Sequence, residues 1–92
     1  MIACEDNCCR IAGAVTVDSV GGLLHDLQPH LARGVDTLDL SGVETADSAA
    51  LALVFSAMRE ASQAGRTLAL RGLPASFTTL AELYGVAELL PA

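Results

Sequence analysis

The sequence has no lysine, and its five arginines are outnumbered by eleven acidic residues, which gives a net charge of −6. This imbalance repels the phosphates of nucleic acids and the head groups of anionic lipids. The chain also lacks a Gly-rich phosphate-binding loop, so it does not have the features of a nucleotide hydrolase. We therefore expect no nucleic-acid partner and no direct insertion into a membrane.

Aromatic residues and long apolar runs are scarce as well. Only three side chains are aromatic although 52% of the residues are hydrophobic, so the core must consist of Leu, Val, Ile and Ala. No apolar run approaches the ~18 to 20 residues of a membrane-spanning helix. The N-terminus carries acids where a signal peptide has basic and apolar regions. The length suits one compact domain, residues 1–92, which we expect to remain in the cytoplasm.

Cysteine is confined to the first tenth of the chain, at Cys4, Cys8 and Cys9, and no second cluster completes a zinc site. His25 and His30 are five residues apart on a predicted helix, so they point about 140° from each other and cannot share a metal ion. Cys8 and Cys9 would point to opposite faces of a strand, which makes a bond between them strained. We predict reduced thiols, no metal and no cofactor.

The hydrophobic pattern predicts an α/β fold with the element order β-β-α-β-α-β-α, in which about three helices pack on a mixed sheet of four strands. The first two strands form a hairpin around Asp6-Asn7. The second helix is the most regular, because strong helix formers continue from Asp47 until Gly65 ends it. The predicted elements are strands 2–5 and 8–12, a helix from about 18 to 34, a strand 35–42, a helix 47–64, a strand 67–72, and a helix from 74 that ends at 85, before a short tail 86–90.

Four acids, Asp36, Asp39, Glu44 and Asp47, bracket the C-terminal end of the third strand, where α/β sheets often bind ligands. Paired acids can transfer protons or hold a cation, so an enzyme would use this cluster. However, no His or Lys is near it in the sequence, and so small a domain has little room for a deep pocket. We interpret the cluster as a solvated acidic rim and predict no catalytic residue.

The start of the second helix is the more interesting feature. Asp47 and Ser48 stand where backbone N–H groups lack partners and where the helix dipole favours negative charge, so a phosphoryl group on Ser48 would be stabilised. The alternative is that Asp47 or Ser48 only caps the helix, an arrangement that stabilises a helix by ~1 kcal/mol.

The same helix has unusually few charges on its predicted outer face. If Leu51, Val54, Phe55 and Met58 face inward, small and hydroxyl residues and one leucine remain outside over the first turns. Such a flat surface favours contact with another protein, although alanines are also tolerated on surface helices. The predicted partner-binding surface consists of Asp47, Ser48, Ala49, Ala52, Leu53 and Ser56.

The stretch from Leu38 to Leu53, LDLSGVETADSAALAL, resembles the signature of STAS domains, the family of anti-sigma factor antagonists. The resemblance extends through Leu73-Pro74 and residues 80–86 and is greatest to the MlaB-like branch, the STAS subunits of phospholipid-transport ABC systems. It implies that Asp47-Ser48 is the acid-hydroxyl pair of the family. Ser48 would be the residue that kinases phosphorylate in anti-sigma factor antagonists, or a contact with the ATPase in MlaB-like subunits. Ala50 departs from the glycine of many members, and the short chain favours the transporter branch.

Two functions follow from this resemblance. The first is a non-enzymatic adaptor that binds and regulates or stabilises the ATPase of an ABC-type phospholipid transporter, in complex with its permease. Such an adaptor would be peripheral at the inner face of the inner membrane and would reach it through its partner. The alternative is an anti-sigma factor antagonist in which a serine kinase switches binding through Ser48.

Overall fold

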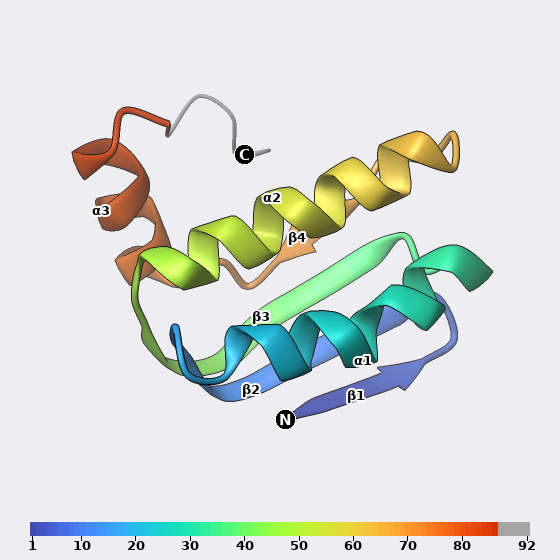
Figure 1. Ribbon diagram of the computed structural model, residues 1–92, viewed down its shortest axis with the longest axis horizontal. Coiled ribbons are helices and arrows are strands. Elements are labelled where there is room, and N and C mark those ends of the chain that lie inside the picture. The colour runs from blue at the N-terminus through green and yellow to red at the C-terminus, as the bar shows by residue number, and fades with distance from the viewer. Residues whose placement is uncertain (87–92) are drawn as a thin grey trace.

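The computed structural model describes residues 1–86 and confirms the predicted element order (Figure 1). The predicted tail lies, from residue 87 on, outside the described residues. The elements are β1 (Ile2–Glu5), β2 (Cys8–Val15), α1 (Val20–Arg33), β3 (Thr37–Ala46), α2 (Ser48–Gln63), β4 (Ala69–Arg71) and α3 (Ala75–Leu83).

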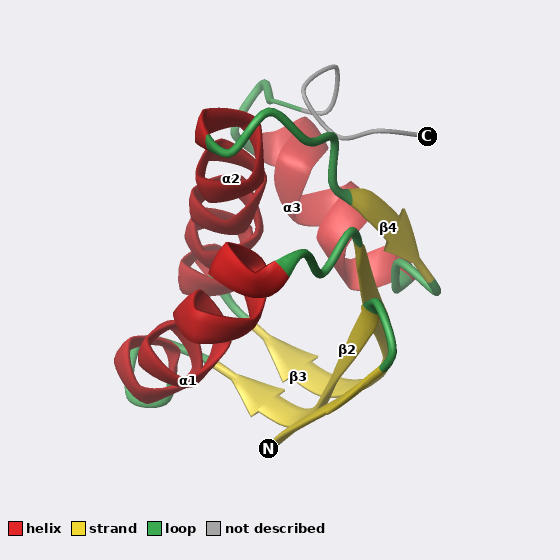
Figure 2. Ribbon diagram, turned by 90° about the vertical axis from the view of Figure 1, so that its right-hand side faces the viewer, coloured by secondary structure: helices red, strands yellow, loops and turns green. Residues whose placement is uncertain are grey.

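The four strands form one mixed sheet, as predicted, and their order in it is β1-β2-β3-β4. β1 and β2 are antiparallel and joined by a tight turn at Asp6, whose φ of 55° lies in the left-handed region that Asp tolerates. The pairs β2–β3 and β3–β4 are parallel. Parallel neighbours need a crossover connection, and α1 and α2 provide the two crossovers. These two helices lie side by side on one face of the sheet (Figures 1 and 2).

The core lies between this face of the sheet and the helices, and it is aliphatic as the composition predicts. On β2 and β3 the core side chains alternate with outward ones, because successive residues of a strand point to opposite faces. α1 contributes three leucines spaced four residues apart, which share one side of the helix. The fully buried side chains include Cys9, Ile11, Val15, Leu27, Leu38, Leu40, Leu53, Val54 and Phe77.

The strand ends differ from the predicted ones. β3 begins two residues later than predicted and continues to Ala46, because its second half pairs with β2 from Gly42 opposite Ala12 to Ala46 opposite Val15. β2 is correspondingly longer than the predicted strand and β4 is shorter. Local sequence does not determine these ends, since they depend on hydrogen bonds to strands far away in the chain. The long pairing brings the end of β3 and the start of α2 beside the end of β2.

The cysteines are the clearest correction. Cys4 and Cys9 form a disulfide, whereas reduced thiols were predicted; Cys8 remains a free thiol. The two bonded residues are directly opposite each other on β1 and β2, with their Cα atoms 4.0 Å apart. The prediction for the adjacent pair holds, because Cys8 and Cys9 are not bonded to each other. Cys4 and Cys9 come together through the register of the hairpin, which the spacing of cysteines in the sequence does not reveal.

No helix among residues 1–86 is long and apolar enough to cross a membrane.

Candidate partner-binding site

Ser48 is the first residue of α2, and its side chain is exposed. Asp47 precedes it as the N-cap, with an extended backbone and a carboxylate that accepts a hydrogen bond from the backbone N–H of Ala49 at 2.8 Å. Of the two residues that the sequence offered as the cap, Asp47 and Ser48, Asp47 is therefore the one that caps the helix. The Ser48 hydroxyl is thus presented at the positive end of the helix dipole.

The second carboxylate oxygen of Asp47 has a different partner. It accepts a hydrogen bond from the backbone N–H of Val17 at 3.1 Å, and the N–H of Asp47 itself donates to the carbonyl of Val15. Asp47 thereby fastens the loop between β2 and α1 to the start of α2. One carboxylate holds two segments of the site that are thirty residues apart.

Val17 is the residue of this site that sequence reasoning missed. Its side chain is 72% exposed, which makes it one of the few large apolar side chains on the described surface. It lies beside the N-terminus of α2 because its backbone is bonded to Asp47. The sequence signal for an exposed Val17 is weak, because an isolated valine between polar residues is common in strands as well as in loops. Its position follows from the end of β2 at Val15, three residues later than predicted.

The predicted surface on α2 requires one correction. Ala52 is exposed and Ala49 and Ser56 are half-buried, but Leu53 is only 1% exposed and belongs to the core. The buried side chains are Ala50, Leu51, Leu53, Val54, Ala57 and Ala61, whereas Phe55 and Met58, predicted to face inward, are half-buried. The single-stripe prediction failed because α2 packs against α1 and α3 as well as the sheet, and these neighbours bury a wider arc.

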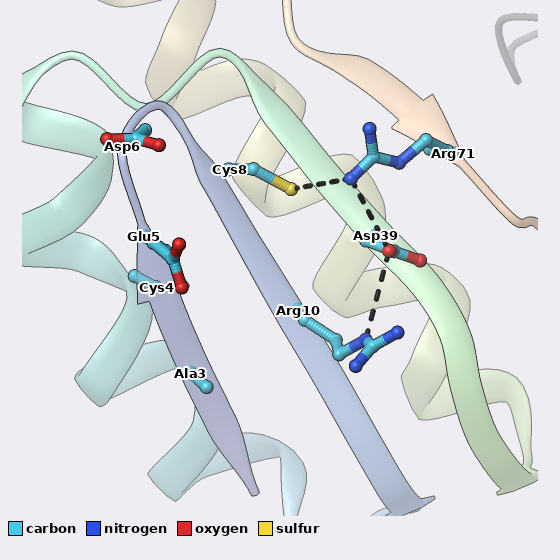
Figure 3. Close-up of a pocket in the computed structure, with 8 residues that line it drawn as sticks. All are labelled: Ala3, Cys4, Glu5, Asp6, Cys8, Arg10, Asp39 and Arg71. Atoms are coloured by element: carbon cyan, nitrogen blue, oxygen red, sulfur yellow. Dashed lines mark hydrogen bonds and ion pairs between the residues drawn. The ribbon is translucent and has the colours of Figure 1, made fainter.

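The predicted acidic rim also does not form as one cluster. Asp39 is the third residue of β3, on the sheet face opposite the core. It is 7% exposed and lies far along the strand from Asp47, which precedes α2. Arg10 on β2 and Arg71 on β4 flank it in register, with nitrogen–oxygen distances of 3.8 and 3.5 Å (Figure 3). A charge-compensated acid in a sheet is a structural arrangement and offers no free pair of carboxylates.

Asp39 is held mainly by Ser41, whose hydroxyl and backbone N–H both donate to one carboxylate oxygen, at 2.7 and 2.9 Å. These bonds, helped by Arg71 and Arg10 and opposed by burial, lower the pKa of Asp39 from its ordinary value of 3.8. The backbone of Gly72 approaches Ser41 closely, so that an added Cβ at residue 72 would lie 2.6 Å from the Cβ of Ser41. The φ of Gly72 is +68°, so close approach and backbone angle both require glycine there.

Replacing this acid gives a prediction about pH. The pKa of Asp39 is lower in the folded chain than in the unfolded chain, so its carboxylate stabilises the fold at pH values above the pKa of the unfolded state. This stability is lost as the pH falls through the pKa of the folded state. Asp39→Asn should lower the free energy of unfolding by about 1 kcal/mol at pH 7. The difference from wild type should shrink below pH 3.8. Urea unfolding at several pH values measures this, with Asp26→Asn, an exposed acid on α1, as the control.

A shallow cavity of about 390 Å³ lies on the same open face of the sheet, beside Asp39 (Figure 3). The free thiol of Cys8 accepts a hydrogen bond from Arg71 at its edge, at 3.3 Å. Its other walls come from the β1–β2 hairpin, through Ala3, Cys4, Glu5 and Asp6. The cavity does not adjoin Ser48, which projects from the opposite layer of the molecule, so the two are separate features.

Comparison with known proteins agrees with this architecture. The chain is similar to the solved structure of the anti-sigma factor antagonist SpoIIAA in its unphosphorylated form, with a TM-score of 0.68 and 16% sequence identity. The match covers 99% of this chain and 84% of the other, and at this identity it establishes the fold only. No curated protein matches the chain.

A family model gives the more specific result. The model described as the MlaB STAS domain matches residues 3–91, nearly the whole sequence. Domains of this family typically bind other proteins or act as adaptors. The matched stretch includes the β3–α2 junction with Asp47 and Ser48, where the sequence resemblance was strongest. The chain therefore belongs to the STAS domains of the MlaB type.

Proposed function

We propose that this protein is a non-enzymatic adaptor that docks the start of α2 on the ATPase of an ABC-type phospholipid transporter. The observation that supports this best is the exposed Ser48 hydroxyl with the exposed apolar side chain of Val17 beside it. A rigid surface that combines a polar group and an apolar anchor suits the centre of a protein interface. The proposed surface consists of Val17, Asp47, Ser48, Ala49, Ala52 and Ser56.

The chemistry around Ser48 favours binding over catalysis. A serine nucleophile needs an adjacent general base that is placed to accept its proton. Both carboxylate oxygens of the neighbouring Asp47 accept backbone N–H groups, so this acid is committed to holding the loop and the helix. Both histidines are on α1. His30 lies in the last turn of this helix, near Cys9 at the start of β2, whereas Asp47 contacts Val15 at the other end of that strand.

Charge indicates what kind of surface the partner presents. The chain carries a net charge of −6, and Asp18 and Glu44 are exposed on the two segments that meet at Asp47. A basic protein surface would be attracted to this region, whereas anionic lipids would be repelled. We therefore infer that any association with the inner face of the inner membrane goes through the ATPase and its permease.

A phosphorylation switch is the second candidate, and the exposure of Ser48 at a helix N-terminus favours it. A kinase could reach this hydroxyl, and phosphorylation would add about −1.5 to −2 charges beside Asp47. The phosphate would repel the acidic residues around it, Asp47 and Glu44, and this repulsion would release the partner in the sigma-factor network. Similarity to the fold of SpoIIAA supports this alternative as much as the MlaB-type family match supports the first.

Affinity purification from native cells, followed by mass spectrometry, separates the two functions. The adaptor function predicts that an ABC-type ATPase and its permease are recovered with the tagged chain. The switch predicts a serine kinase and a sigma factor. Recovery of neither pair would contradict both proposals.

Ser48 itself gives a sharper test. If Ser48 is a contact of the adaptor, Ser48→Ala should change recovery of the ATPase only a few-fold. Ser48→Glu should reduce recovery by about tenfold or more, because a charge is then buried in the interface. A switch predicts instead that the co-purified kinase transfers phosphate from ATP to wild type and not to Ser48→Ala. Ser62→Glu is the matched control, since Ser62 is exposed near the other end of α2, about 21 Å away along the helix axis.

A further inference from the structure

Three potential metal ligands meet where the β1–β2 hairpin lies under the end of α1. Cys4 of β1 and Cys9 of β2 are directly opposite each other, and His30 comes from the last turn of α1. Their sulfur and nitrogen ligand atoms all lie within 4.8 Å of one another. Cys9 is fully buried, while Cys4 and His30 are half-buried, so the group can be reached from one side.

Spacing in the sequence did not predict this group. The other histidine, His25, is exposed and lies outside the group, so the ligands come from one histidine and two cysteines and not from a pair of histidines. The ligands come together because α1 runs back over the hairpin and ends above the Cys4–Cys9 pair. Cys8 is also excluded, because it points to the other face of the sheet, toward Arg71.

We propose that Cys4, Cys9 and His30 form a site for Zn²⁺ when the disulfide is reduced. A dithiol reductant supplies two electrons and two protons, breaks the S–S bond, and is itself oxidised to a disulfide, which leaves two thiols on the hairpin. Zn²⁺ then binds both sulfurs as thiolates and one ring nitrogen of neutral His30, and two protons are released. Thiolate and imidazole are the ligands that zinc prefers, and water completes the tetrahedron.

The geometry needs only small adjustments. Zinc–sulfur and zinc–nitrogen bonds of about 2.3 and 2.0 Å place tetrahedral ligands roughly 3.6 to 3.8 Å apart. The histidine nitrogen already lies within 4.8 Å of both sulfurs, so it has to approach by about 1 Å. The sulfurs, once reduced, separate toward the same spacing. Position also favours a cation, because His30 belongs to the last turn of α1, where the helix dipole is negative.

Such a site would fasten the same elements in either redox state. The disulfide joins β1 to β2 in an oxidising medium, and zinc would join both strands to α1 in a reducing one. Metal bound only by the folded chain stabilises it by mass action, so the reduced protein should melt at a higher temperature with zinc than without.

Titration of the reduced full-length chain with Co²⁺ under anaerobic conditions tests the proposal, because cobalt replaces zinc and gives visible and near-ultraviolet bands when bound to thiolates. We expect one Co²⁺ per chain, displacement of the bands by Zn²⁺, and no thiolate bands with the oxidised chain. His30→Asn should weaken binding at least about tenfold, since it removes one of three protein ligands. The matched controls His25→Asn and Cys8→Ser should bind as wild type does.

Circular dichroism of each oxidised variant confirms that it is folded, because all three keep the Cys4–Cys9 bond. Absence of cobalt–thiolate bands in the reduced wild type would overturn the proposal. So would unchanged binding in His30→Asn, which would reduce the site to two thiols. Loss of binding in Cys8→Ser would also overturn it, because another set of ligands would then hold the metal.

Discussion

Leu53→Ala is expected to lower the free energy of unfolding by about 2 to 5 kcal/mol, the range for removing a large aliphatic side chain from a core. Leu53 is 1% exposed and lies on α2 among the residues that pack toward the sheet and the neighbouring helices. Chemical denaturation monitored by circular dichroism measures the loss.

The control for this prediction is the preceding residue. Ala52 is exposed, so Ala52→Glu should change the free energy of unfolding by no more than about 0.5 kcal/mol. The two variants compare a buried and an exposed position at adjacent residues of one helix. If Leu53→Ala left stability unchanged while Ala52→Glu unfolded the chain, the orientation of α2 described above would be wrong. The pair also shows why Leu53 is unsuitable for testing partner binding, since its loss would act through folding.

The fold could be predicted in outline because its signals are local. Asp47 caps α2, Gly34 and Gly65 follow the ends of two helices, and the leucines of α1 recur at helical spacing. The turn at Asp6 placed the hairpin. The predictions that failed concern features that depend on contacts with neighbouring strands and helices. Strand ends, the length of β3 and the face of α2 that is covered all follow from contacts between distant segments.

The candidate site was predicted in the same partial way. Asp47 and Ser48 were identified because capping chemistry and family resemblance are both written in consecutive residues. Asp39 was assigned to a solvated rim, although it is compensated by Arg10 and Arg71, because those partners lie on other strands and become visible only from the register. The disulfide and the position of His30 were missed for the same reason. Val17 was missed because its importance depends on a hydrogen bond to a residue thirty positions away.

Under the proposed adaptor function, Val17→Glu should reduce recovery of the ATPase by about 30-fold or more, the effect of losing an interface residue that contributes about 2 kcal/mol or more. The exposed apolar side chain beside Ser48 is the part of the proposed surface that gains most from leaving water. A carboxylate there would replace the apolar contact with a charged group that loses its water in the interface, beside the acidic neighbours Asp18 and Asp47. Quantitative mass spectrometry of the proteins purified with the tagged variant measures this loss.

The isolated domain should remain stable in this variant. The Val17 side chain is 72% exposed, and its bond to Asp47 comes from the backbone N–H, which glutamate also has. The melting temperature should therefore stay close to that of wild type. Ser62→Glu adds the same charge near the far end of α2 and should leave recovery unchanged. Equal recovery with Val17→Glu and Ser62→Glu would place the partner elsewhere on the molecule. A large fall in melting temperature would mean instead that the loop between β2 and α1 supports the fold through the Val17 side chain.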